Sequence, residues 1–175
     1  MKVILVFVST LDGKITEWGN SHVRKWTSKE DQEYYKQIWK NERLIVMGSN
    51  TYMAEKFSPS PHLLLLVMTK HISKYKEYEV PGQIEFIDTE PKDLVEQYQK
   101  KGFEKMMVVG GPHVATSFFE EQLIDELWLT IEPKIFGKGG NFVSEQKLDI
   151  DLTMIKCEKV NEKGTMIARY AVIKK

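Results

Sequence analysis

Two short motifs place glycines and polar side chains directly after apolar, strand-like runs. One is Val109-Gly110-Gly111-Pro112-His113 and the other is Met47-Gly48-Ser49-Asn50-Thr51. Glycines let a backbone approach a ligand closely, and the free amide groups at the start of a helix attract phosphate. Ser, Asn and Thr side chains can cap such a helix or hydrogen-bond to a phosphate. We therefore expect a pyrophosphate site, although a plain tight strand-helix turn would explain either motif alone.

Two further motifs should lie at the same edge of the predicted sheet. In the first, Asp12 and Lys14 follow the opening apolar run; alone they would form an Asp-Gly turn, but beside a bound dinucleotide they could orient a substrate and manage a proton. In the second, Thr69 and Lys70 follow the run Leu63 to Met68. A cation there could meet the 2′-phosphate of NADPH, and a solvated surface lysine is the alternative.

Composition limits the class of protein. The chain has 175 residues, which predicts one domain over residues 1–175. Its 25 Lys and Arg residues balance 25 Asp and Glu residues, so we expect no nucleic-acid partner. The single cysteine, Cys157, excludes an intramolecular disulfide and is expected to be buried, and the scattered histidines predict no metal site. The apolar N-terminal run is too short to span a bilayer, so we expect a cytoplasmic protein with no membrane partner.

Apolar, β-branched runs alternate with amphipathic stretches, which indicates an α/β fold. Helices are predicted after Ser28, from Pro91 to Gly102 and from Pro112, and Ser28 with the acid three residues later forms a potential reciprocal cap. The expected strands are Val3 to Val8, Arg43 to Met47, Leu63 to Met68, Ile84 to Ile87, Lys105 to Val109, Glu126 to Ile131, Thr153 to Val160 and Thr165 to Ile173.

The last two strands flank Asn161-Glu162-Lys163-Gly164 and predict a hairpin. We therefore expect a three-layer arrangement: a mixed, mostly parallel central sheet, helices on both faces and a C-terminal antiparallel hairpin. Alternating apolar residues of the final strand, Met166, Ala168, Tyr170 and Val172, could either cover the protein's own core or provide a surface for a second copy.

Six motifs in order resemble the reductase domain of the bifunctional deaminase-reductases of riboflavin biosynthesis, which has the dihydrofolate-reductase fold. They are Ser9-Thr10-Leu11-Asp12-Gly13-Lys14, Lys25-Trp26-Thr27-Ser28, Met47-Gly48-Ser49-Asn50-Thr51, Val109-Gly110-Gly111-Pro112, Leu123-Ile124-Asp125-Glu126-Leu127 and Pro133-Lys134-Ile135-Phe136-Gly137. The resemblance covers nearly the whole chain, although the zinc signature of the deaminase domain is absent.

The resemblance implies an NADPH-dependent reductase that acts on the ribose of a phosphoribosylamino-pyrimidine, and a homodimer that pairs through the C-terminal part of the sheet. It assigns cofactor contacts to residues 48–51 and 110–113, catalytic positions to Asp12 and Lys14, and an acidic position to Glu55. Two positions depart from the family: Val109 replaces a Glu before the paired glycines, and residues 55–59 replace an Asp-Pro-x-Leu stretch that is followed by an Arg.

Two other functions stay open. A dihydrofolate reductase acting on a pterin would also have an apolar residue before its paired glycines, but it needs an acid in the first helix to pair with the pterin. Lys25 to Ser28 contains none, and we interpret Glu30 and Asp31 as acids that stabilise the start of a helix. The third possibility is a nucleotide-binding module without catalysis.

Overall fold

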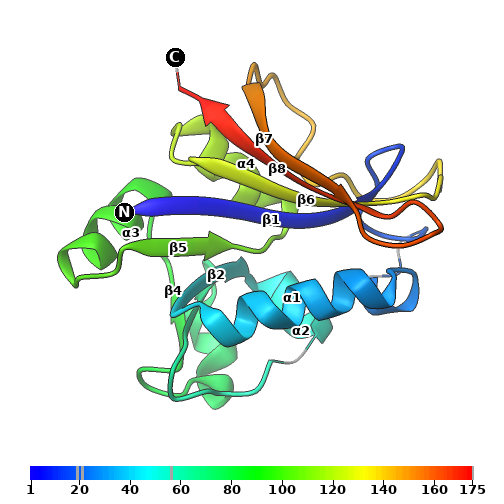
Figure 1. Ribbon diagram of the computed structural model, residues 1–175. Helices are drawn as coiled ribbons and strands as arrows, with labels where there is room; N and C mark the ends of the chain where they lie inside the picture. The colour runs from blue at the N-terminus through cyan, green and yellow to red at the C-terminus, as the bar shows by residue number, and fades with distance from the viewer. Residues whose placement is uncertain (19, 21, 56, 175) are drawn as a thin grey trace.

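Eight strands form one mixed sheet in the part of the chain that the structure describes. The structure is a computed structural model, and it describes residues 1–18, 20, 22–55 and 57–174 (Figure 1). The sheet has the order β4-β3-β2-β5-β1-β6-β8-β7, in which the strands from β4 to β6 are parallel and β8 and β7 are antiparallel to their neighbours. The strands are β1 (Lys2–Thr10), β2 (Leu44–Gly48), β3 (Leu64–Met68), β4 (Ile84–Ile87), β5 (Lys105–Val108), β6 (Glu126–Glu132), β7 (Asp151–Lys159) and β8 (Met166–Ile173).

Helices cover both faces of this sheet, so the expected α/β arrangement is confirmed (Figure 1). One face packs against α1 (Lys29–Asn41) and α2 (Ser49–Glu55), and the other against α3 (Pro91–Lys100) and α4 (Pro112–Glu120). Two 3₁₀ segments, η1 (Val23–Lys25) and η2 (Ile72–Tyr78), were not predicted from the sequence.

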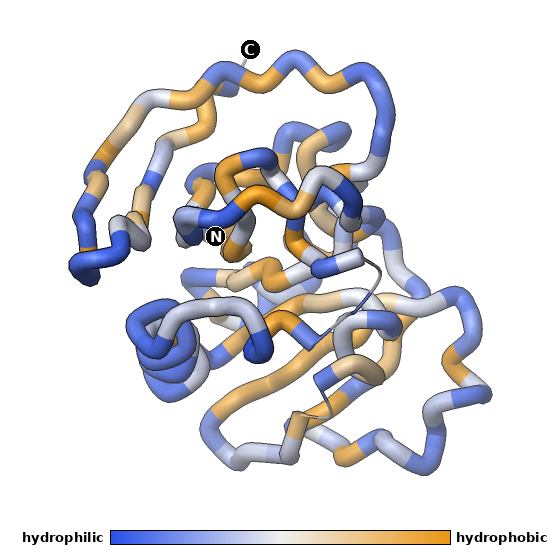
Figure 2. The backbone as a smooth tube through the Cα atoms, turned by 90° about the vertical axis from the view of Figure 1, so that its right-hand side faces the viewer, coloured by the Kyte–Doolittle hydropathy of each residue, from blue (hydrophilic) through white to orange (hydrophobic). Residues whose placement is uncertain are grey.

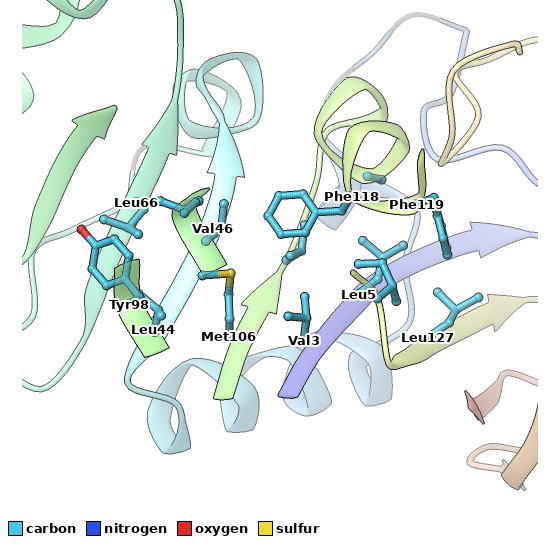
Figure 3. Packing of buried hydrophobic residues seen from close by; sticks show 14 residues of the cluster. Val3, Leu5, Leu44, Val46, Leu66, Tyr98, Met106, Phe118, Phe119 and Leu127 are labelled. Atoms are coloured by element: carbon cyan, nitrogen blue, oxygen red, sulfur yellow. The ribbon is translucent and has the colours of Figure 1, made fainter. Parts of the chain in front are cut away.

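The central strand β1 contributes to both layers of the core, because successive side chains of a strand point to opposite faces. Val3 and Leu5 pack with α3 and α4, whereas Ile4 and Val6 pack on the α1 face. Figure 3 shows the first of these clusters, in which Phe118 of α4 lies over the strands. The continuous apolar run of β1 is therefore a strand that is buried on both sides.

The two strands of the C-terminal hairpin differ in exposure, and this decides between the two alternatives left open for β8. Ala168 is fully buried, and Tyr170 and Val172 pack against the core, so these three residues of β8 cover the protein's own interior. The outer strand β7 is exposed along its whole length, and Figure 2 shows apolar and polar residues mixed along this part of the chain. The prediction of a buried Cys157 is wrong, because Cys157 lies on this edge strand and is exposed.

The described helices are too short or too polar to cross a membrane.

Candidate active site

A cavity of about 440 Å³ lies at the carboxyl ends of β1, β2 and β5. Val6 and Val8 of β1 form part of its floor, and Gly48 and Val109 border it where β2 and β5 end. The helices α1, α2 and α4 supply the walls. In an open α/β sheet, ligands bind beyond the carboxyl ends of the parallel strands, which is where this cavity opens.

The paired glycines bring the two phosphate-type motifs into direct contact. The amide of Gly48 donates to the carbonyl of Gly110 at 2.8 Å, and Gly110 and Gly111 are joined by a cis peptide bond. A Cβ atom on Gly111 would lie 3.2 Å from the Thr51 Oγ1 atom, and one on Gly48 would lie 3.2 Å from the Cγ2 atom of Val114. Side chains at these positions would therefore fill the space in which the two motifs meet.

The first turn of α4 faces this junction. Gly111 is its N-cap residue and supplies no side-chain cap, and Pro112 occupies the first helical position. His113 borders the cavity and its Nδ1 atom lies 2.9 Å from the hydroxyl oxygen of Ser144. The start of this helix is thus open to an anion, with the positive end of the helix dipole directed toward it.

The structure brings most of the predicted site residues to this one cavity. They are Gly48, Ser49, Asn50, Thr51, Glu55, Gly110, Gly111, Pro112 and His113. Glu55 lies at the end of α2 and forms an ion pair with Arg24, with 3.1 Å between Oε2 and Nε. The Glu55 side chain is 17% exposed and that of Arg24 is 67% exposed, so the pair lies at the rim.

Asp12 does not border the cavity. Its Oδ1 atom accepts hydrogen bonds from the Thr10 hydroxyl and the Phe136 amide, and its Oδ2 atom accepts one from the Gly137 amide at 2.7 Å. These hydrogen bonds, first that from Thr10, lower the pKa of Asp12. Asp12 therefore fastens the turn after β1 to the loop after β6.

Lys14 also lies outside the cavity lining and makes a similar connection. Its Nζ atom donates to the Asn141 Oδ1 atom at 2.9 Å. The next two residues, Ile15 and Thr16, do border the cavity, and the Thr16 hydroxyl accepts from the Gly140 amide at 2.7 Å. Asp12 and Lys14 thus hold a loop whose following residues form one wall.

Thr69 and Lys70 follow Met68, which borders the cavity, but do not border it themselves. The Thr69 amide donates to the Ile87 carbonyl at 2.8 Å and extends the pairing of β3 with β4. Lys70 is exposed beyond the carboxyl end of β3. Their contact with a 2′-phosphate stays a prediction.

Asp31 is a site residue that the sequence analysis interpreted only as a helix-start acid. It lies in the first turn of α1, borders the cavity and is only 7% exposed. Burial raises its pKa from 3.8 to about 6, an effect that the hydroxyl of Thr130 beside it partly offsets and the negative charge of Glu132 adds to. A carboxyl group with this pKa can exchange a proton near neutral pH.

The sequence of β6 already indicated that polar side chains are buried beside the start of α1. Side chains of β6 alternate between the two faces, and Trp128 packs on the α1 face. The same alternation places Thr130 and Glu132 on that face, where both are 2% exposed. Polar residues at buried strand positions predict a hydrogen-bonded partner across the layer, here the start of α1.

The match to known proteins agrees with this geometry. A family model described as the RibD C-terminal domain matches residues 1–166. The chain belongs to the RibD C-terminal domain family. It is 25% identical to the riboflavin biosynthesis protein RibD of Aquifex aeolicus (strain VF5), with 78% of this chain aligned to 48% of that protein. The chain therefore spans about half the length of that relative.

Two solved structures show the fold of this family member. A putative riboflavin biosynthesis protein from Shewanella sp. PV-4 has a TM-score of 0.79 at 20% identity, covering 99% of this chain and 100% of that one. A dihydrofolate reductase from Enterococcus faecalis, complexed with NADP(H), has a TM-score of 0.68 at 18% identity, covering 99% and 97%. The expected dihydrofolate-reductase-like fold is confirmed.

Proposed function

We propose that this chain is an NADPH-dependent reductase whose substrate binds beside Asp31. Membership of the RibD C-terminal domain family supports a reductase, and the structural similarity to a dihydrofolate reductase that was solved with NADP(H) supports the choice of cofactor. The observation that carries the proposal is the placement of one buried carboxyl group and two glycine-rich turns around a single cavity.

The residues present fit a dinucleotide. We call the surface formed by Gly48, Gly111 and Thr51 the cradle. An added Cβ atom would crowd Val114 if placed on Gly48 and Thr51 if placed on Gly111, and the uncapped first turn of α4 faces the same place. A pyrophosphate would accept hydrogen bonds from the backbone amides of the first turn of α4 and from the side chains of Ser49 and Asn50. NADPH, when bound, supplies the hydride, so the chain's own task is to orient the acceptor and handle a proton.

Asp31 suits the second task. Reduction of a carbon-nitrogen double bond adds a hydride to carbon and a proton to nitrogen. A carboxyl group with a pKa of about 6 can supply or stabilise that proton from the wall of the cavity. Asp12 lies outside the cavity, where all its hydrogen bonds hold loops together.

The riboflavin-pathway phosphoribosylamino-pyrimidine is the first substrate candidate, because of the family. The second is a pterin, and Asp31 specifically favours it. The sequence argument against a pterin interpreted Asp31 only as an acid that stabilises the start of a helix; in the structure Asp31 borders the cavity. A carboxylate there could accept two hydrogen bonds from the ring nitrogen and amino group of such a heterocycle.

The test is oxidation of NADPH, followed by absorbance, with the phosphoribosylamino-pyrimidine and with dihydrofolate. We expect turnover with one of them and loss of at least about a hundredfold in kcat for the Asp31→Asn variant. Cofactor binding without turnover on either compound would contradict the proposal and leave a nucleotide-binding module. Equal kcat in Asp31→Asn would remove Asp31 from the site.

A further inference from the structure

Glu132, at the end of β6, connects two elements that are distant in sequence. Its Oε1 atom accepts a hydrogen bond from the Ser28 amide at 2.7 Å, and its Oε2 atom accepts one from the Thr165 hydroxyl at 2.8 Å. Glu132 is 2% exposed and Thr165 is 1% exposed, so both bonds are shielded from water. One buried side chain thus ties the start of α1 to the start of β8.

The turn of the C-terminal hairpin makes a second connection to the same place. Asn161 Oδ1 accepts from the amides of Gly164 and Thr165, each at 3.0 Å. Its Nδ2 atom donates to the Thr165 hydroxyl at 2.9 Å and to Glu30 Oε2 at 3.0 Å. In Figure 1 the tip of the hairpin formed by β7 and β8 lies beside the first turn of α1.

These contacts change the local structure that the sequence favours at the start of α1. Ser28 Oγ accepts from the Asp31 amide at 3.2 Å, which is one half of a capping box. In the other half the Asp31 carboxyl would fold back onto the Ser28 amide. Glu132 binds that amide instead, which leaves the Asp31 carboxyl to border the cavity.

We propose that Glu132 is a positioning residue, which occupies the Ser28 amide so that the Asp31 carboxyl stays in the cavity and cannot cap its own helix. The proposal rests on the function proposed above, in which Asp31 acts on the substrate. Asp31 is faced by Glu132 and Thr130 from β6 and by Tyr34 and Tyr35 from α1. The negative charge of Glu132 also contributes to the raised pKa of Asp31.

The deciding experiment is a carbon-13 NMR titration of the Asp31 carboxyl in the full chain without substrate. It compares the wild type with Glu132→Gln, which keeps the side-chain shape, and with Glu132→Ala. We expect the midpoint to move to lower pH in both variants, through lost charge in the first and through capping of the Ser28 amide in the second. Glu126→Gln is the matched control, because Glu126 is on the same strand but binds Lys2 and Trp128, and its midpoint should equal that of the wild type.

An Asp31 midpoint in Glu132→Ala equal to that in Glu132→Gln would overturn the proposal, because lost charge alone would then explain both shifts. If Glu132→Ala does not fold, Glu132→Asp takes its place, because it keeps the charge and shortens the reach to the Ser28 amide; an unchanged midpoint in that variant would overturn the proposal. In steady-state kinetics we expect Glu132→Ala to lower kcat by roughly tenfold while the dissociation constant of NADPH changes less than about twofold, since the geometry is altered at Asp31 and not at the glycine-rich turns. The titration needs no substrate. A shifted Asp31 midpoint in a chain that shows no turnover would therefore contradict the proposed function and support the positioning role.

Discussion

The Asp31 carboxyl is withdrawn from water and yet borders the cavity in which a substrate would bind. Its raised pKa therefore affects both activity and stability. The ionised form is disfavoured by burial and by Glu132, so the folded protein holds a proton at a pH where the unfolded chain has released it. Asp12 has the opposite property, a lowered pKa at an exposed position.

The stability of the folded chain should reflect this proton. Between about pH 4 and pH 6 the folded state binds the extra proton, so stability contributed by this group falls as the pH rises and stays low above pH 6. Asp31→Asn should raise the free energy of unfolding by roughly 2–3 kcal/mol at about pH 8 and by little at about pH 4. Urea unfolding at the two pH values checks this, and an equal effect at both would contradict the buried-charge account.

The pH dependence of turnover separates the two aspartates. If protonated Asp31 assists the reaction, kcat should fall as the pH rises through about 6. Asp12→Asn should lower kcat more than NADPH affinity, because it loosens the loops around Ile15, but the pH at which kcat falls should not move. Disappearance of that pH dependence in Asp12→Asn would instead assign the proton to Asp12.

At the scale of elements, the two glycine-rich turns meet because the strands before them, β2 and β5, are neighbours in the sheet. The strand-like runs and helix starts predicted these elements well, since β2 and β5 are buried strands and α4 begins at the predicted Pro112. Asp31 could not be recognised in the same way, because an acid three residues after a serine fits an ordinary helix cap. Its true position depends on Glu132, whose contact with Ser28 spans 104 residues of sequence.

Gly111 should tolerate no side chain if a cofactor lies against it. A Cβ atom in Gly111→Ala would stand 3.2 Å from Thr51 Oγ1 and narrow the cradle. We expect this variant to weaken NADPH binding by roughly tenfold or more, as measured by calorimetry. Ser117→Ala is the control, because Ser117 is on the same helix but does not itself border the cavity; its hydroxyl donates to the Val114 carbonyl. Equal NADPH affinities in the two variants would contradict the placement of the cofactor against Gly111.

At the scale of the whole molecule, β7 leaves an apolar edge uncovered. Leu152, Met154 and Ile155 are 40%, 55% and 53% exposed, on an edge strand whose outer backbone groups can pair with another strand. We propose that a second copy of the chain covers β7. Of the β8 residues that were considered for this purpose from the sequence, Ala168 is buried, and Tyr170 and Val172 pack against the core.

A homodimer of this kind should dissociate when a charge is placed on β7. Met154→Lys should shift sedimentation toward the chain mass of 20.4 kDa, whereas Ile135→Lys, at an exposed apolar residue that is not on β7, should leave the dimer intact. A wild-type chain that sediments as a monomer at all concentrations would contradict the dimer.

The most direct test of the central claim is a crystal structure of the chain grown with NADP⁺. We predict that the pyrophosphate lies against Gly111 at the start of α4 and beside Ser49 and Asn50, with the nicotinamide ring in the cavity that Asp31 borders. Cofactor bound elsewhere on the molecule, or no cofactor at saturating concentration, would contradict it.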